Sequence, residues 1–356
     1  MPAPRLRGAV APVASLLAVS ACTLGGSVTP GFRSPSILPA ASGSPAPALA
    51  PNQFVNPVLG RDFPDPGALK VGSTWYTYAT TGNGDNLQAA RSTDLVHWEY
   101  LDEVLPKLAT WSTGDTWAPE VRRTSAGYVM YYTTRDPNLI RPDGTGSQCV
   151  SVAVASSPAG PFSDRSSGPL VCQPKLGGSI DPFPFTDADG TRYLIWKSDG
   201  NCCQMPTRIW GQRLSADGLS LVPGTPTDLG ETNDQAWEGS VVEAPTLLLH
   251  DGTYFLFYSA GNYADGTYAV GYATAPRVLG PYRDAVGNPI LKTRDAAGAQ
   301  GPGGQTIVTG PDGSLWVLYH AWDPNFLERS MWLDRLRFVA GRPVIDGPTD
   351  RPQAKP

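Results

Sequence analysis

Histidine is scarce in this chain of 356 residues. Its three copies, His97, His250 and His320, form no HExxH arrangement, which excludes a histidine-rich catalytic zinc centre. Charge is also sparse: 17% of residues are charged, the net charge is -5, and no dense basic run follows the extreme N-terminus. We therefore expect no nucleic-acid partner. No glycine-rich loop joins a strand to a helix, so we expect no nucleotide cofactor.

Long stretches without glycine or proline are few. The 39 glycines and 36 prolines make up more than a fifth of the chain, which leaves little room for long helices and excludes an α-helical bundle. The hydrophobic fraction of 41% is typical of a globular protein. The composition therefore predicts a chain that folds around a core, as one large domain or two ordinary ones.

The N-terminus has the features of an export signal. Arg5 and Arg7 precede the apolar run 9–21, which is too short to span a bilayer but suits the core of a signal peptide. The run ends in Val-Ser-Ala before Cys22, which resembles a bacterial lipobox. We predict that residues 1–21 are a lipoprotein signal peptide and that Cys22 carries the lipid. An ordinary cleavage site with a chance cysteine is the alternative.

The next segment has the composition of a spacer. Residues 22–52 are rich in Pro, Ser, Gly and Ala and almost free of aromatic residues, so they cannot bury enough surface to fold. We predict a flexible tether there and a folded domain over residues 53–356. Contact with the membrane is expected only through the lipid anchor.

Four cysteines remain for the folded domain: Cys149, Cys172, Cys202 and Cys203. An even number of cysteines in an exported chain predicts two disulfides. The favoured pairing joins Cys149 to Cys172 and leaves Cys202 and Cys203 as a vicinal pair. The two crossed pairings stay open, because sequence alone does not choose among the three.

The most informative feature is an internal repeat. Five segments share a short polar start, an apolar strand, a glycine-containing turn and a second strand dense in aromatic residues. They begin at Asp65, Ala118, Asp181, Glu243 and Gly303, and Pro66, Pro119, Pro182 and Pro245 recur at intervals of 53, 63 and 63 residues. Asp-Gly pairs at 189–190, 251–252 and 312–313 mark hairpin turns.

A fixed period of this length fits a radial array of small sheets, since one four-stranded sheet cannot cover both of its faces alone. We predict an all-β fold, a five-bladed β-propeller with a four-stranded antiparallel sheet in each blade. A large β-sandwich is the alternative, but it predicts no fixed period.

The repeat predicts a cluster of acids. The first strand of each propeller blade runs nearest the axis, so residues that start these strands converge. The repeat assigns those positions to Asp65, Ala118, Asp181, Glu243 and the glycine-rich 303–305. Grouping three carboxylates costs electrostatic energy, so we expect the cluster to serve a chemical function. Hydrolysis of a glycosidic bond is such a function, since one carboxylic acid protonates the leaving oxygen and a carboxylate activates water or attacks.

The motifs FPDP at Asp65, TWAPEV at Trp117, GGSIDPFPF at Asp181, VVEAP at Glu243 and YHAW at His320 resemble those of glycoside hydrolase family 43. The resemblance extends from Asn56 to about Pro348. It implies a five-bladed propeller that acts on arabinose- and xylose-containing polysaccharides with inversion of the anomeric centre. Inversion predicts that the base and acid carboxyl groups lie roughly 6.5–9.5 Å apart.

The resemblance also implies a role for each acid. Asp65 is expected to be the general base and Glu243 the general acid. Asp181 is expected to keep the pKa of Glu243 high and to orient that side chain. Glu238 is a rival for the general acid, but the repeat places it in the loop before the axial position.

Other positions carry weaker predictions. Trp117 is expected to stack on a sugar ring, with core packing as the alternative, and Glu120 is expected to be structural. In relatives a histidine at the place of His320 contacts a metal, usually calcium, so His320 is a candidate calcium contact or else a packed core residue. Residues 301–304 read Gly-Pro-Gly-Gly where the family often has Gly-Pro-Gly-His, which weakens that expectation.

We therefore expect an exported, inverting glycoside hydrolase, at the cell surface or outside the cell. The motif set favours an α-L-arabinofuranosidase that releases arabinose from arabinan or arabinoxylan. A β-xylosidase, an endo-arabinanase or a galactofuranosidase would use the same three acids, and a non-catalytic carbohydrate-binding propeller is an alternative of another class. We expect no cofactor for the chemistry, and any Ca²⁺ is expected to be structural. We also expect a monomer.

Overall fold

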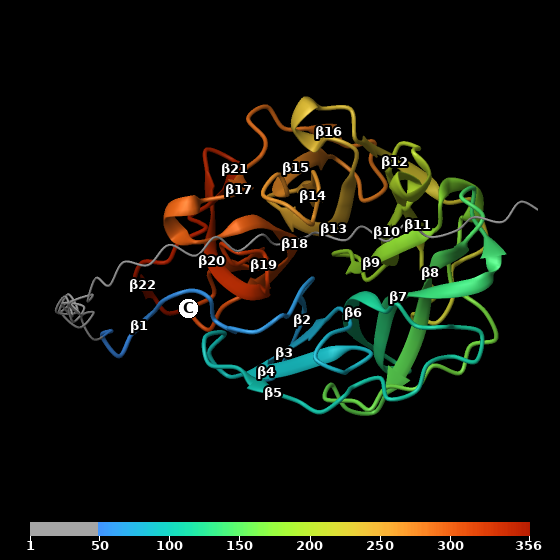
Figure 1. Cartoon of the computed structure of the whole chain (residues 1–356), viewed down its shortest axis with the longest axis horizontal. Helices are drawn as coiled ribbons and strands as arrows, with labels where there is room; N and C mark the ends of the chain where they lie inside the picture. Colours follow the sequence, from blue (N-terminus) through green and yellow to red (C-terminus); the bar gives the residue numbers. More distant parts are fainter. Residues whose placement is uncertain (1–48) are drawn as a thin grey trace, which may run out of the picture. The chain divides into compact units, whose positions relative to one another are not determined.

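Small antiparallel sheets follow one another around a central axis in residues 49–356, the part of the chain that the computed structural model describes (Figure 1). Five of these sheets are the blades of a β-propeller, which confirms the predicted fold. The predicted signal peptide, Cys22 and most of the predicted tether lie outside the described residues. In the described part, no helix is long and apolar enough to cross a membrane.

The blades follow the order of the chain. Blades one and two contain β2 (Gly67–Val71), β3 (Thr74–Ala79), β4 (Gln88–Ser92) and β5 (Glu99–Tyr100), then β6 (Trp117–Thr124), β7 (Gly127–Ile140) and β8 (Gly146–Ala155). Blade three contains β9 (Ser179–Thr186), β10 (Arg192–Ser198), β11 (Arg208–Arg213) and β12 (Thr227–Thr232).

Blade four contains β13 (Val242–His250), β14 (Thr253–Ala260), β15 (Ala269–Ala275), β16 (Arg283–Asp284) and β17 (Leu291–Lys292). Blade five contains β18 (Gln300–Thr309), β19 (Leu315–Trp322), β20 (Arg329–Val339) and β21 (Arg342–Ile345). Four short 3₁₀ helices connect strands in this part of the chain: η1 (Pro174–Leu176), η2 (Gly200–Cys203), η3 (Ala236–Glu238) and η4 (Asp295–Ala297).

Two blades depart from the predicted four strands. Blade two has a three-stranded sheet, and two isolated bridges, Val154 with Ser163 and Val150 with Val171, stand where a fourth strand would lie. In blade four, both β16 and β17 pair with β15.

The predicted turn at Asp251 and Gly252 is a two-residue hairpin loop between β13 and β14. Both residues have a positive φ, 46° and 74°. Positive φ at both positions is the conformation of a type I′ turn, which Asp-Gly favours because its twist matches that of the strands.

The hydrophobic core is divided among the seams between neighbouring blades. In β14, Phe255 and Phe257 pack toward blade five, whereas Leu256 and Tyr258 pack toward blade three. Successive side chains of a strand point to opposite faces of its sheet, and here both faces are covered. This explains why the second strand of each repeat is apolar throughout instead of alternating with polar residues.

The ring is closed by the segment that precedes blade one. The side chain of Asn56 exchanges hydrogen bonds with the backbone of Leu333 in β20, at 2.8 and 2.9 Å. The Val58 N–H donates to the carbonyl of Met331 in the same strand. In addition, β1 (Gln53–Phe54) pairs with β22 (Gln353–Ala354) near the two ends of the described chain.

Candidate active site

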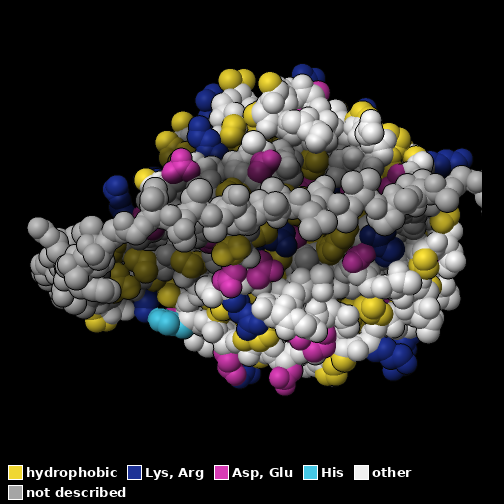
Figure 2. Space-filling model, viewed as in Figure 1, with side chains coloured by type: hydrophobic (Ala, Val, Ile, Leu, Met, Phe, Trp, Pro, Cys, Tyr) yellow, Lys and Arg dark blue, Asp and Glu magenta, His cyan; other side chains and the backbone are white. Residues whose placement is uncertain are grey.

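A cavity of about 340 Å³ opens among the inner strands, within the size range of small-molecule sites. We call it the large cavity. All three predicted carboxylates line it: Asp65, Asp181 and Glu243. Its other charged or aromatic side chains are Arg141, Lys197, Asp199, Arg329, Trp117, Tyr263 and Tyr268. Acidic and basic side chains also lie on the outer surface, as Figure 2 shows for one face of the molecule.

Near the start of each inner strand lies a residue of positive φ, between 43° and 59°: Asp65, Ala118, Asp181, Ala244 and Gly304. Such φ values are uncommon outside glycine and are concentrated at functional sites. The prediction that Glu243 occupies this position in blade four is wrong by one residue. Aligning on Pro245 gives Ala244, and Glu243 lies one position earlier.

The strand register supports this correction. Glu243 pairs with Ser259, as Trp117 pairs with Thr133 and Ile180 with Lys197. Glu243 is therefore the counterpart of Trp117 and Ile180, and all three line the large cavity. The carboxylates converge from two successive ring positions, not from one.

The inner strands are attached to the preceding blades by a ring of buried side chains at or just after the second strands: Thr80, Thr133, Lys197, Ser259 and His320. Four of them accept the N–H of a positive-φ residue, from Ala118, Asp181, Gly304 and Asp65, at 2.9 to 3.1 Å. Lys197 cannot, because an ammonium group has no lone pair. The N–H of Ala244 donates instead to Oδ2 of Asp181 at 2.9 Å.

Asp65 is surrounded by groups that stabilise its negative charge. Thr80 donates a hydrogen bond to its Oδ2 at 2.6 Å, and Nδ1 of His320 lies 3.3 Å from its Oδ1. Burial raises the pKa of Asp65, but the contact with His320, the charge of Arg329 and the Thr80 hydroxyl outweigh burial and bring the pKa to about 2. With 23% of its side chain still exposed, Asp65 is an ionised carboxylate accessible from the cavity.

Glu243 is held by two donors. Nζ of Lys197 lies 2.8 Å from its Oε2, and the hydroxyl of Tyr268 donates to its Oε1 at 2.8 Å. The Tyr268 ring is stacked on His320, with centroids 5.8 Å apart. Lys197 is fully buried and also lies 3.4 Å from Asp199. Burial lowers the pKa of Lys197, but the charges of Glu243 and Asp199 more than offset it, so Lys197 stays charged.

Asp181 has the opposite environment to Asp65. Burial raises its pKa to about 8, and the negative charge of Glu243 adds to the effect, while Lys197 opposes it. Asp181 therefore keeps its proton at neutral pH. The site combines an ionised carboxylate, Asp65, with a protonated carboxyl group, Asp181, and acid–base catalysis requires such a division.

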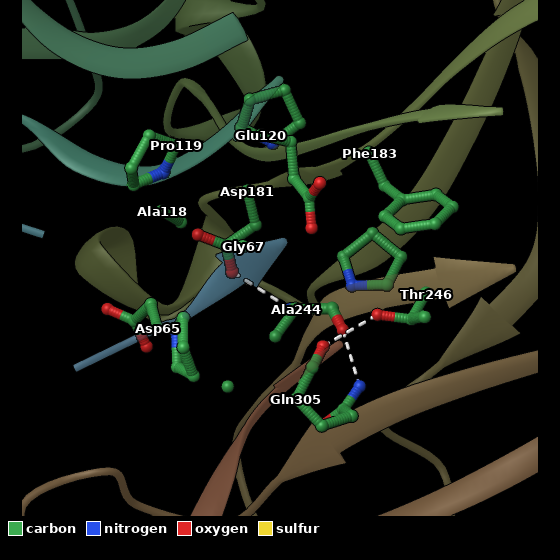
Figure 3. Close-up of a pocket in the computed structure, with 14 residues that line it drawn as sticks. Asp65, Gly67, Ala118, Pro119, Glu120, Asp181, Phe183, Ala244, Thr246 and Gln305 are labelled. Atoms are coloured by element: carbon green, nitrogen blue, oxygen red, sulfur yellow. Dashed lines mark hydrogen bonds between the residues drawn. The ribbon is translucent and has the colours of Figure 1, made fainter. Parts of the chain in front are cut away.

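A narrower cavity of about 30 Å³ lies along the axis (Figure 3). Asp65 and Asp181 line this cavity as well as the large one. Glu120 also lines it, is buried, and forms a 2.8 Å ion pair with Arg122. This pairing agrees with the structural role expected for Glu120.

His320 lies in β19 and is fully buried, and its Nε2 has no hydrogen-bond partner among the described residues. Calcium prefers six to eight oxygen ligands, so one imidazole nitrogen fits this ion poorly. The groups of acidic residues and cysteines that come together elsewhere in residues 49–356 do not include His320. The calcium contact stays a prediction, and nothing below depends on it.

The remaining predicted residues fall in different places. Trp117 lines the large cavity, at the start of β6. Glu238 is fully buried in η3, accepts hydrogen bonds from Tyr258 and Gln235, and lines neither cavity. The structure pairs Cys149 with Cys172 and Cys202 with Cys203, which confirms the favoured disulfides. Cys202 also lines the large cavity.

The side chains of the large cavity that were not predicted from the sequence include Arg141, Lys197, Tyr268 and Arg329. Lys197 had a usable signal, since a lysine inside the apolar strand Tyr-Leu-Ile-Trp-Lys-Ser is a buried charge in need of a partner. The other three lie in or beside loops whose sequences show no periodicity.

A large cavity that combines an ionised Asp65, a protonated Asp181 and a third carboxyl group, Glu243, has the residues of an acid–base hydrolase. The sequence model of glycosyl hydrolases family 43 matches residues 54–343. The chain belongs to glycosyl hydrolases family 43.

Similar proteins are consistent with this membership. The crystal structure of a thermostable family-43 glycoside hydrolase superimposes with a TM-score of 0.76 at 34% identity, covering 85% of this chain and 99% of the other. A protein of Xylanibacter ruminicola named "Putative beta-xylosidase" is 29% identical over 79% of this chain. The match covers 49% of that relative, so this chain spans about half of its length. An extracellular endo-α-(1→5)-L-arabinanase of Bacillus subtilis is 26% identical, covering 73% of this chain and 80% of the arabinanase.

Proposed function

We propose that this chain hydrolyses glycosidic bonds of arabinose- or xylose-containing polysaccharides with inversion of the anomeric centre. One observation carries the proposal: Asp65, Asp181 and Glu243 line a single cavity of sugar-binding size with contrasting protonation. Membership of family 43 supports the same activity.

In the proposed mechanism Asp65 is the general base. Its low pKa keeps it ionised at neutral pH, so it can accept a proton from the attacking water. The hydroxyl of Thr80 fixes the orientation of the carboxylate, and Nδ1 of His320 holds the backbone of Asp65 by accepting its N–H. Because water attacks as the bond to the leaving group breaks, no covalent sugar intermediate forms and the configuration is inverted.

Glu243 is the proposed general acid, and Asp181 its positioning partner. In this proposal Glu243 gives a proton to the leaving oxygen as the glycosidic bond breaks. The hydrogen bond from Ala244 fixes Asp181 beside the acid, and Lys197 and Tyr268 fix Glu243. Trp117 is proposed to stack on a sugar ring from the cavity wall.

The proposed substrate is an α-L-arabinofuranoside of arabinan or arabinoxylan. Relatives bear names of several specificities, among them a β-D-galactofuranosidase of Aspergillus niger and an exo-α-(1→5)-L-arabinofuranosidase of Cellvibrio japonicus. A β-xylosidase, an endo-arabinanase or a galactofuranosidase would use the same carboxylates, so the activity panel below includes their substrates.

A carbohydrate-binding propeller without catalysis is the second candidate, since aromatic side chains such as Trp117 and Tyr263 would serve binding alone. Three carboxylates at one cavity, with the pKa of Asp65 lowered and that of Asp181 raised, go beyond what binding a neutral sugar requires. This observation favours the hydrolase.

We further propose export of a monomer with a signal peptide over residues 1–21, a lipidated Cys22, a tether over 22–52 and a catalytic domain over 53–356. The names of several relatives describe them as extracellular, which supports export. Labelling with a radioactive fatty acid, lost in Cys22→Ser, would test the anchor.

The activity is tested with a panel of arabinan, arabinoxylan, xylan and aryl α-L-arabinofuranoside, β-xyloside and galactofuranoside, with product anomers followed by NMR. The proposal expects release of the inverted sugar from an arabinofuranoside. Failure of the wild type to hydrolyse any of these substrates would instead favour the binding propeller.

A further inference from the structure

A second group of carboxylates lies at the seam between blades three and four. Glu231 comes from β12, Glu238 from η3 and Asp284 from β16. One carboxylate oxygen of each residue lies within 4.8 Å of an oxygen of each of the others. None of the three lines the large or the axial cavity, so the proposed hydrolysis does not use them.

These carboxylates have too few hydrogen-bond donors. The hydroxyl of Tyr258 lies 2.7 Å from Glu238 and 2.8 Å from Asp284, but its single proton can go to only one of them. The N–H of Gln235 donates to the other oxygen of Glu238. Oε1 of Glu231, a residue that is only 1% exposed, has no partner among the described residues. Six oxygens therefore share two donors.

No positive side chain compensates. Within residues 49–356, no lysine, arginine or histidine forms an ion pair with any of the three carboxylates. Asp164 in blade two shows how a carboxylate is usually stabilised by donors. It accepts hydrogen bonds from the hydroxyls of Tyr132 and Ser151 and from the backbone N–H of Ser166. Buried carboxylates without such donors are costly unless a cation or protons neutralise them.

We propose that Glu231, Glu238 and Asp284 bind a divalent cation, with Ca²⁺ as the ion of best fit. Ca–O bonds are about 2.3–2.6 Å long, so two oxygens on one ion lie at most about 5 Å apart, as these do. A donor set made only of oxygens suits Ca²⁺ and not the softer metals. The unpartnered oxygen of Glu231 gains a ligand in this way.

The bound ion links blade three to blade four. It joins β12 and β16 to η3, the short helix that precedes β13, the strand that carries Glu243. The site is therefore structural and lies apart from the candidate contact at His320. The inference does not rest on the proposed hydrolysis, and its test uses no activity measurement.

The first experiment is thermal unfolding of the full chain, stripped with a chelator and then measured with and without excess CaCl₂. We expect Ca²⁺ to raise the Tm of the wild type by about 5 °C, the size expected at roughly 100 times the Kd. In Glu231→Gln the rise disappears, yet the stripped variant is no less stable than the stripped wild type, since one repelling charge is gone. Asp164→Asn is the matched control, which loses a partly buried carboxylate but keeps the Ca²⁺ response.

The inference is overturned if Ca²⁺ leaves the wild-type Tm unchanged, or raises it equally in Glu231→Gln. The carboxylates would then hold protons instead of a metal. If Glu231→Gln fails to fold, wild-type crystals soaked in MnCl₂ decide the question. An anomalous peak among the three carboxylates supports the site. If crystals soaked at a saturating MnCl₂ concentration show no peak there, the inference is overturned.

Discussion

Nζ of Lys197 lies 2.8 Å from the carboxylate of Glu243 and is completely shielded from solvent. The same ammonium group lies 3.4 Å from Asp199, and its charge also acts on Asp181. One buried cation thus serves three carboxylates. Where the other blades have a hydrogen-bond acceptor for the next inner strand, blade three has this cation, and Asp181 accepts the N–H of Ala244 in its place.

Lys197→Met should be strongly destabilising, because it leaves buried carboxylates without their cation. We expect the free energy of unfolding at pH 8 to fall by about 3–5 kcal/mol, and by less at pH 5, where the carboxylates take up protons. Urea unfolding at both pH values measures this, with Lys197→Arg as the charge-preserving control. An equal loss at both pH values would show that packing, not charge, explains the effect.

The pH dependence of kcat/KM should be set by two different groups. Asp65, with a pKa of about 2, stays ionised through the acidic range, so activity persists to about pH 4. Activity then falls as the pH rises through about 8, because the proton that burial and Glu243 keep on Asp181 is lost and none remains for the leaving group. Initial rates on an aryl glycoside between pH 3 and 10 measure the profile. An acidic limb with a midpoint near pH 5 would be incompatible with this assignment.

Asp181→Asn should separate stability from activity. The raised pKa of Asp181 means that the folded state binds more protons than the unfolded state between about pH 4 and 8, so wild-type stability declines as the pH rises through that window. The amide cannot ionise, yet its oxygen still accepts from Ala244. We expect the variant to match the wild type at pH 4 and to exceed it by about 1–3 kcal/mol at pH 8, with hydrolysis lost. A variant less stable than the wild type at pH 8 would contradict the repulsion argument.

The two disulfides should contribute very differently to stability. Cys149–Cys172 closes a separation of 23 residues, and chain entropy predicts that replacing both cysteines by alanine costs about 3 kcal/mol. Cys202–Cys203 joins adjacent residues and restricts the unfolded chain very little. Denaturant unfolding of the two double variants compares them. Equal losses would mean that the vicinal disulfide stabilises the folded state directly.

The fold could be predicted from the sequence because the same pattern of residues occurs in each of the five repeats. The Asp-Gly turns, the recurring prolines and the aromatic second strands together predict blades around an axis. The number of strands per blade was harder to predict, since the outer segment of blade two meets β8 only at two isolated bridges.

The site was predictable in composition but not in geometry. The motif around Glu243 identified a residue that lines the large cavity, yet alignment on its first acid instead of Pro245 placed it one ring position too far along. The hydrogen-bond partners of Glu243 could not be predicted from the sequence. One of them, Tyr268, lies just before β15 and comes close to Glu243 only when blade four folds. The seam carboxylates come together only because blades three and four pack, a contact that no local pattern encodes.

The central claim is that Asp65 and Glu243 perform the hydrolysis, and steady-state kinetics of Asp65→Asn and Glu243→Gln on the best substrate of the panel test it most directly. The account predicts that kcat falls by about 10²–10⁴-fold in each variant, while Glu99→Gln, an exposed glutamate in β5, keeps the wild-type rate. A folded Asp65→Asn or Glu243→Gln enzyme with wild-type kcat would contradict the account.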